Sequence, residues 1–201
     1  MPSRRSRPTR EVILETAMDL ASVEGLEGVS IGRLADALGM SKSGVIGHFA
    51  SKEDLQLATI EAARGTFETE VLGRLDAEPG LARLRSMAEC WIDYVEGEHF
   101  SGGCFFWAAS AEFDGRPGTV RDRLAELTAS WLDAIQAEAR LAQRLGEISA
   151  GEDPAQLAFE LHAYVQEANW AYQLLEREDA FRRARRAVDD RLGRAAASAG
   201  D

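Results

Sequence analysis

Hydrophobic residues along most of the chain recur every three or four positions, a spacing that places them on one face of an α-helix. Nine helices are expected in this way, approximately over residues 9–23, 31–38, 42–49, 52–75, 81–96, 102–113, 117–145, 154–177 and 179–197. No stretch shows the sustained apolar–polar alternation that is typical of a strand. The pattern therefore predicts an all-α fold.

Three helix starts lie close together within residues 30–55, and each has its own capping residue. Ser30 is placed to cap the first of these helices, and Gly39 is placed to end it. Ser41 caps the next helix only two residues later, and Ser51 opens a Ser-x-x-acid capping box for the third. So short a connection predicts a helix-turn-helix motif, whose second helix enters the major groove of DNA.

The chain has a net charge of −11, but this charge is unevenly distributed. Residues 1–52 contain seven Lys or Arg and six Asp or Glu, whereas the remainder contains 16 and 28. Four of the seven basic residues lie in an N-terminal arm, at Arg4, Arg5, Arg7 and Arg10. The asymmetry suits a protein that presents one end to phosphate. The arm itself is either a DNA-binding segment or a basic tail.

Several other classes of protein do not fit this sequence. No apolar run approaches the roughly 18 residues of a membrane span, and no apolar segment of a secretory signal follows the basic start. We therefore expect a cytoplasmic protein with no membrane partner. The two cysteines, Cys90 and Cys104, either pack as small apolar groups or form a redox-sensing pair.

An enzyme is the main alternative from a different class. The chain lacks a glycine-rich nucleotide loop, a spaced nucleophile and base, and a metal-ligand cluster. We therefore expect no enzymatic activity, no cofactor and no metal. A helical adaptor that binds only protein is a second alternative, and the motif with its basic arm speaks against it.

Residues from about 9 to 60 resemble the DNA-binding domain of the TetR family of bacterial transcriptional regulators. The resemblance covers roughly residues 9–60 and rests on Ile13-Leu14, Ala17, Leu20-Ala21, Gly25, Val29, His48-Phe49 and Ser51-Lys52, together with the motif between them. It implies a DNA-binding domain over residues 1–52 and a helical regulatory and dimerisation domain over residues 53–201. The second region matches the family only in length and helical layout.

The resemblance implies DNA-binding residues in two roles. Lys42, Ser43 and Gly44, at the start of the second helix of the motif, would face base edges. Contacts with phosphates are expected for Ser30, Arg33, Ser41, His48 and Lys52. Alternatively, the lysines are solvated surface residues and His48 is an interior or capping residue.

One segment departs from the family pattern. The family usually has a Leu-aromatic pair where this chain has Val45-Ile46, and Gly47 replaces a larger side chain. The aromatic hydroxyl often contacts a phosphate, which Ile46 cannot do. The departure leaves the operator sequence and the affinity open.

The family also implies a dimer and an effector site. The last two helices of each subunit would pair into a four-helix bundle through Leu161, Tyr164, Val165, Ala168, Tyr172, Phe181 and Val188. Alternatively, these side chains close the core of one chain. An effector would contact Trp91, Phe106, Trp107 and Trp131. Aromatic residues at helical spacing can equally be core residues.

These features together predict a homodimeric, sequence-specific DNA-binding regulator. Its partners would be a palindromic double-stranded operator and a small-molecule effector of unknown identity. We expect a repressor that the effector releases from DNA, although activators share this architecture.

Overall fold

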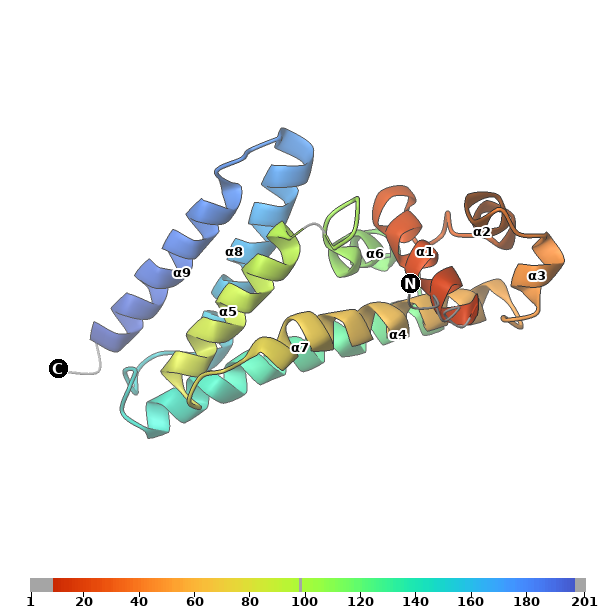
Figure 1. Cartoon of the computed structure of the whole chain (residues 1–201). Coiled ribbons are helices and arrows are strands. Elements are labelled where there is room, and N and C mark those ends of the chain that lie inside the picture. Colours follow the sequence, from red (N-terminus) through yellow and green to blue (C-terminus); the bar gives the residue numbers. More distant parts are fainter. Residues whose placement is uncertain (1–8, 98, 198–201) are drawn as a thin grey trace, which may run out of the picture. The chain divides into compact units, whose positions relative to one another are not determined.

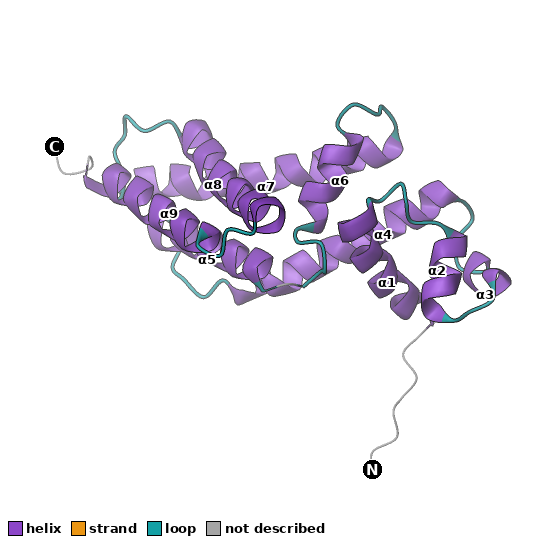
Figure 2. Ribbon diagram, turned by 90° about the horizontal axis from the view of Figure 1, so that it is seen from above, coloured by secondary structure: helices purple, strands orange, loops and turns teal. Residues whose placement is uncertain are grey.

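The computed structural model of the chain describes residues 9–97 and 99–197. Over these residues it contains nine α-helices and one short 3₁₀-helix, and no strand (Figures 1 and 2). The helices are α1 (Thr9–Glu24), α2 (Ile31–Leu38), α3 (Lys42–Ile46), α4 (Lys52–Glu70), η1 (Leu72–Arg74), α5 (Leu81–Glu96), α6 (Phe105–Phe113), α7 (Thr119–Arg144), α8 (Pro154–Leu175) and α9 (Ala180–Ala197). The all-α prediction is confirmed.

The chain divides into two compact units, and the boundary falls within α4 and within α7. The N-terminal unit comprises Met1–Thr66 and Phe100–Ala125, and the C-terminal unit comprises Phe67–His99 and Glu126–Asp201. The division expected after residue 52 does not coincide with this one. The N-terminal unit also takes in most of α4, all of α6 and the beginning of α7.

In the N-terminal unit, α1 packs against α2 and α6, and α2 packs against α3. The core of this unit is apolar, and its fully buried side chains include Ile13, Leu26, Leu34, Val45, Leu55, Ile60 and Phe105. The α5–α6 loop reaches α1 through two backbone donors. Ser101 N donates to Asp19 Oδ1 over 2.8 Å, and Gly102 N donates to Ser22 Oγ over 3.0 Å.

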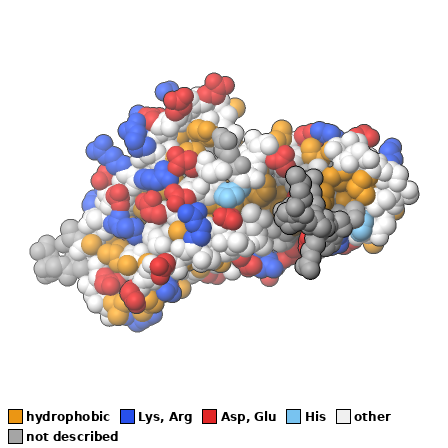
Figure 3. Space-filling model, in the orientation of Figure 1, with side chains coloured by type: hydrophobic (Ala, Val, Ile, Leu, Met, Phe, Trp, Pro, Cys, Tyr) orange, Lys and Arg blue, Asp and Glu red, His pale blue; other side chains and the backbone are white. Residues whose placement is uncertain are grey.

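In the C-terminal unit, α5, α8 and α9 pack against one another. Leu84, Ile92, Leu157, Val165, Phe181 and Val188 are among the buried side chains of this unit. Acidic and basic side chains are interspersed over the surface that carries α5 and α9 (Figure 3). Arg185 of α9 illustrates the pairing, because it donates to Asp93 Oδ1 over 2.7 Å and to Glu96 Oε2 over 2.6 Å, both on α5.

Several helices end earlier or start later than the sequence pattern predicts. The expected helix over residues 42–49 stops at Ile46, where Gly47 follows as the C-cap. The expected helix over residues 52–75 stops at Glu70, before the 3₁₀ turn η1. The sixth and seventh helices begin at Phe105 and Thr119, because glycines precede both starts. Apolar periodicity continues past these points, so it does not mark the helix ends.

None of the helices in the described residues is long and apolar enough to cross a membrane. Within the same residues, no cluster of His, Cys, Asp and Glu is arranged to hold a metal ion. The two thiols are free and lie in different units. Burial raises the pKa of the Cys104 thiol, while backbone N–H groups of Trp107 and Phe106 partly oppose that rise. Cys104 is thus a buried, neutral thiol, whereas Cys90 is half-buried.

Candidate nucleic-acid interface

The α2–turn–α3 segment is built from the caps that the sequence predicts. The Ser30 side chain accepts a hydrogen bond from Arg33 N over 3.2 Å, and the Ser41 side chain accepts one from Gly44 N over 3.1 Å. Gly39 ends α2 in the left-handed region, at a φ of 64° that strongly favours glycine. The helix-turn-helix prediction is confirmed.

The third helix start of the motif also has its cap. Ser51 Oγ accepts from Asp54 N over 3.0 Å, and the Asp54 carboxylate accepts from Ala50 N over 2.9 Å. The second bond reaches the residue before the cap, so the arrangement is a variant of the capping box, and together the two bonds fix the beginning of α4. Lys52 is the first residue of this helix, so the box also fixes where its side chain starts.

The five-residue helix α3 has one buried side and one solvent side. Val45 is fully buried and holds α3 in the core, whereas Lys42, Ser43 and Ile46 are exposed. The Ser43 hydroxyl lies 3.1 Å from that of Ser41. The solvent side of α3 therefore offers one cation, one hydroxyl and one apolar side chain to a partner.

Gly44 has a role in the geometry of the turn, apart from any contact with a partner. It is half-buried, and a β-carbon at this position would lie 3.3 Å from Ser41 Oγ and 3.4 Å from Met40 Cε. The contact with Ser41 Oγ is tighter than ordinary packing, so a larger residue would require the capping serine to shift. A glycine at position 44 thus leaves the cap of α3 undisturbed.

The basic residues of the motif differ in how they are paired. Among the described residues, Lys42 makes no ion pair, and its side chain extends beside Gly32 at the start of α2, where a β-carbon would lie 3.8 Å from Lys42 Nζ. Arg33 binds the carboxylate of Glu24 through Nε and Nη2, and Lys52 pairs with Glu27. Lys42 is therefore the most available cation on this surface.

The carboxylates that hold Arg33 and Lys52 are themselves stabilised in the charged form. The hydrogen bond from Arg33 lowers the pKa of Glu24. Hydrogen bonds from Lys52 and then from Gln56 lower the pKa of Glu27. A phosphate that approaches either cation must therefore compete with a carboxylate that stays ionised at neutral pH.

Arg10, which the sequence pattern assigns only to the basic N-terminal arm, lies beside the end of the motif. The guanidinium of Arg10 lies 5.5 Å from the centroid of the Phe49 ring, as in a cation–π contact. His48 is half-buried, and its ring centroid lies 6.3 Å from that of Phe49. Arg4, Arg5 and Arg7 lie outside the described residues. No local sequence signal links position 10 to position 49, which is why Arg10 was not among the predicted contacts.

The four residues expected to contact an effector fall into two groups. Trp91 and Trp131 lie in the C-terminal unit, while Phe106 and Trp107 lie in the N-terminal unit. Trp91 and Trp131 make an edge-to-face contact within the C-terminal unit, with ring centroids 5.5 Å apart.

The C-terminal unit contains a continuous series of aromatic contacts. Its centroid distances are 5.1 Å for His162–Trp91, 5.5 Å for Trp91–Trp131, 5.1 Å for Trp131–Phe67, 5.5 Å for Phe67–Tyr94 and 4.9 Å for Tyr94–His99. Trp131 Nε1 is buried and has no hydrogen-bond acceptor among the described residues. Burial lowers the pKa of His162, so its imidazole is neutral at pH 7. We call these six residues the aromatic series.

Most of the residues expected at a dimer interface lie inside one chain. Leu161, Val165, Ala168, Phe181 and Val188 are at most 4% exposed. Tyr172 contacts Phe181 with ring centroids 5.1 Å apart, and Tyr164 is half-buried. The five buried side chains therefore close the core of the C-terminal unit, which was the alternative reading, and an interface would have to use other residues.

Comparisons with known proteins identify the family of this chain. A family profile described as "Bacterial regulatory proteins, tetR family" matches residues 13–59. A second, described as "Tetracyclin repressor-like, C-terminal domain", matches residues 80–188, which is more than half of the chain. The transcriptional regulator AcuR of Cereibacter sphaeroides is 26% identical over 166 residues, which is 77% of this chain and 75% of AcuR.

Solved structures agree with the family profiles. A TetR transcriptional regulator from Chloroflexus aurantiacus superposes with a TM-score of 0.84 at 24% identity, covering 92% of this chain and 94% of that one. AibR in complex with isovaleryl coenzyme A and operator DNA superposes with a TM-score of 0.71 at 25% identity, covering 92% and 96%. The chain belongs to the TetR family, and it is a DNA-binding transcriptional regulator rather than an enzyme.

Proposed function

We propose that this regulator is a homodimeric repressor that binds a palindromic operator through α2 and α3. The observation that carries the proposal is the solvent side of α3, where Lys42 is exposed without an ion pair on a turn fixed by two serine caps. Lys42 and Ser43 contact base edges in the major groove. Arg33, His48 and Lys52 hold phosphates, together with backbone N–H groups near Ser30 and Ser41.

The test is a selection of sheared genomic DNA on the purified protein at near-physiological salt, followed by sequencing of the bound fragments. We expect an inverted repeat whose half-sites are about one helical turn apart, because two copies of the motif bind together. Recovery that depends on salt but not on sequence would contradict specific readout.

Charge reversal at Lys42 is expected to weaken binding to the recovered operator about a hundredfold. Each half-site loses a favourable contact of about 1–3 kcal/mol, and the dimer uses two half-sites. The measurement is a fluorescence-anisotropy titration of labelled operator with Lys42→Glu. Arg186→Glu is the matched control, because Arg186 is 84% exposed on α9 and the substitution changes the net charge equally. Equal affinities for Lys42→Glu and Arg186→Glu would remove Lys42 from the interface.

The proposed dimer uses the exposed side of α8. Phe159 is 66% exposed and Leu174 is 64% exposed, and their separation of 15 residues returns to the same face after about four turns. Exposed apolar groups of this size favour association. A monomeric mass in sedimentation equilibrium at micromolar concentration would contradict the dimer.

The proposed effector site is the aromatic series of the C-terminal unit. Its aromatic rings suit an apolar group, and Trp131 Nε1 offers one buried donor that no described acceptor uses. The matching ligand is an uncharged apolar group with a carbonyl oxygen, such as a short acyl chain. AibR, which is 25% identical, binds isovaleryl coenzyme A together with operator DNA. This supports an acyl ligand for a regulator of this fold.

Trp131→Phe is expected to weaken effector binding about fivefold, because it removes one hydrogen bond of roughly 1 kcal/mol but keeps an aromatic ring. The measurement is release of labelled operator by isovaleryl coenzyme A or isovalerate. Trp107→Phe is the matched control in the other unit. A loss with Trp107→Phe instead would move the site to α6, and no release by either compound would contradict the acyl class.

A further inference from the structure

The side chain of Ile46 is exposed at the end of α3. Ile46 is 55% exposed, whereas its neighbour Val45 is fully buried. Among the described residues of the N-terminal unit, Val23 is the only other large hydrophobic side chain with comparable exposure. An exposed isoleucine adds little to the core of this unit, so its apolar surface is available to a partner outside the chain.

Ile46 shares the solvent side of α3 with Lys42. The two residues are four positions apart, so they lie on the same face, about one 5.4 Å turn apart. Gly47 follows Ile46, and even a β-carbon at Gly47 would meet only Ser43 O, at 3.7 Å. Gly47 therefore adds no side chain between Ile46 and a surface that Lys42 reaches.

The chemistry of the major groove limits what an isoleucine can contact there. Base edges in this groove present hydrogen-bond donors and acceptors, and the one apolar group is the C5-methyl of thymine. Ile46 cannot bond to phosphate, and burying it against a donor or acceptor would leave that group unsatisfied. Successive base pairs of DNA are about 3.4 Å apart, so the 5.4 Å length of one α-helical turn corresponds to one or two base pairs.

We propose that Ile46 is a specificity-determining residue that reads the C5-methyl of a thymine in each operator half-site. This thymine lies one or two base pairs from the base pair or phosphate that Lys42 contacts. The inference rests on the proposed operator binding. It adds an apolar readout at the position where the chain departs from the family's aromatic residue.

The test replaces each thymine of the recovered operator in turn by deoxyuridine, which lacks the methyl group but pairs in the same way. At one symmetric pair of positions we expect affinity to fall roughly fourfold per half-site, as for loss of about one buried methyl group. We expect Ile46→Ala to bind the unmodified operator more weakly and to show no further loss of affinity when deoxyuridine is placed at that pair of positions. Ile46→Val keeps β-branching, so it should retain part of the deoxyuridine effect.

This double-mutant cycle separates the inference from the proposed function. Tight binding of the unmodified operator with no deoxyuridine effect at any position overturns the methyl contact but leaves operator binding intact. The same deoxyuridine effect in the wild type and in Ile46→Ala assigns the methyl contact to another residue and also overturns the inference. Failure to recover any operator contradicts the proposed function itself. Because Ile46 is exposed, circular dichroism of Ile46→Ala should match the wild type.

Discussion

Gly102→Ala is expected to destabilise the N-terminal unit by about 3 kcal/mol or more, at the upper end for overpacking. A β-carbon at this position would lie 2.1 Å from Ser22 O, 2.4 Å from Ser22 C and 2.8 Å from Val23 N. These atoms belong to the backbone of α1, so they cannot turn aside as the end of a flexible side chain can. Either the α5–α6 loop leaves α1 or the end of α1 unwinds.

The measurement for Gly102→Ala is urea unfolding followed by circular dichroism. Gly115→Ala is the matched control, because no atom lies within 4 Å of a β-carbon there and Gly115 belongs to the same unit. We expect the control to change the free energy of unfolding by less than about 0.5 kcal/mol. Equal midpoints for the two variants would show that the loop does not need its close approach to α1.

The close approach at Gly102 belongs to a wider set of contacts between α1, its following turn and the α6 region. The carboxylate of Glu112 on α6 accepts from Glu27 N over 3.2 Å. The side chain of Glu27 in turn pairs with Lys52 and accepts from Gln56 Nε2 over 3.0 Å. A disturbance of α6 thus reaches a proposed phosphate contact through two residues, all within the N-terminal unit.

The sequence could not place α6 in the N-terminal unit, because the contacts that do so join residues about 80 positions apart. Ser101 with Asp19, Gly102 with Ser22 and Glu112 with Glu27 have no local signature. Capping, by contrast, depends on residues within three or four positions of one another. The capping roles of Ser30 and Ser41 could therefore be read directly from the sequence.

Periodicity identified the apolar faces of α8 and α9 but not which surface covers each of them. Leu161 and Val165 were assigned to a dimer interface, yet both are buried within one chain. The exposed side of α8 carries Phe159 and Leu174, which lie outside the apolar stripe predicted from the sequence. The distinction requires three-dimensional burial, because both sets of residues have helical spacing.

At the DNA-binding surface, the number of basic residues in the sequence likewise does not show which of them are free to bind phosphate. Arg33 and Lys52 count as available cations in the sequence, but Glu24 and Glu27 hold them in the fold. These pairs span 9 and 25 positions, so neither follows the i,i+4 rule that a sequence reading can apply. The formal charge of the motif therefore overstates what the free protein offers to phosphate.

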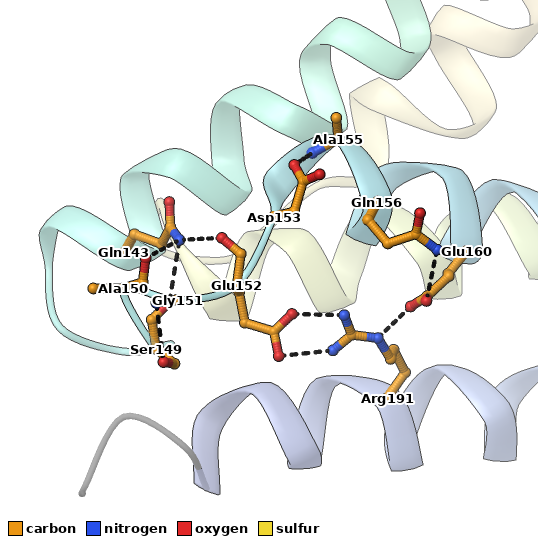
Figure 4. Close-up of polar contacts among 10 residues, drawn as sticks. All are labelled: Gln143, Ser149, Ala150, Gly151, Glu152, Asp153, Ala155, Gln156, Glu160 and Arg191. Carbon is orange, nitrogen blue, oxygen red and sulfur yellow. Dashed lines mark hydrogen bonds and ion pairs between the residues drawn. The ribbon is translucent and has the colours of Figure 1, made fainter.

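Arg191→Ala is expected to destabilise the C-terminal unit by about 2–3 kcal/mol, somewhat less than for a fully buried ion pair. Arg191 of α9 is 9% exposed and donates to both oxygens of Glu152, over 2.6 and 3.2 Å, and to Glu160 of α8 (Figure 4). Its removal leaves two half-buried carboxylates facing each other without their shared cation. Repulsion and desolvation then act in the same direction.

The loop between α7 and α8, which carries the Glu152 partner of Arg191, is held by several hydrogen bonds. The Gln143 side chain donates to the backbone carbonyls of Glu152 and Ser149 over 2.7 and 3.1 Å (Figure 4), and Ser149 N donates to Ala195 O over 3.2 Å. The loop that carries Glu152 is therefore also held by hydrogen bonds that do not involve Arg191. A rigid acceptor reduces the entropy lost on pairing, so this ion pair should contribute more than an exposed one.

The measurement for Arg191→Ala is again the free energy of unfolding in urea, with Arg186→Ala as its matched control. Arg186 lies on the same helix with its side chain 84% exposed, and its pairing with Asp190 at 3.7 Å should be worth less than about 0.5 kcal/mol. Arg191→Lys keeps the charge but not the fork that binds Glu152 twice, so we expect an intermediate loss. Similar stabilities for Arg191→Ala and Arg186→Ala would show that the ion pairs of Arg191 with Glu152 and Glu160 contribute no more than an exposed ion pair.

Acidification provides a second readout of the same cluster. Burial raises the pKa of Glu160, but hydrogen bonds from Gln156 and Arg191, with the charges of Arg191 and Arg194, lower it overall. A carboxyl group whose pKa is lower in the folded state stabilises the fold at neutral pH and loses that contribution as the pH falls through its folded-state pKa. Without Arg191 the pKa of Glu160 rises towards its unfolded value. The stability of Arg191→Ala should therefore fall less steeply than that of the wild type below about pH 5.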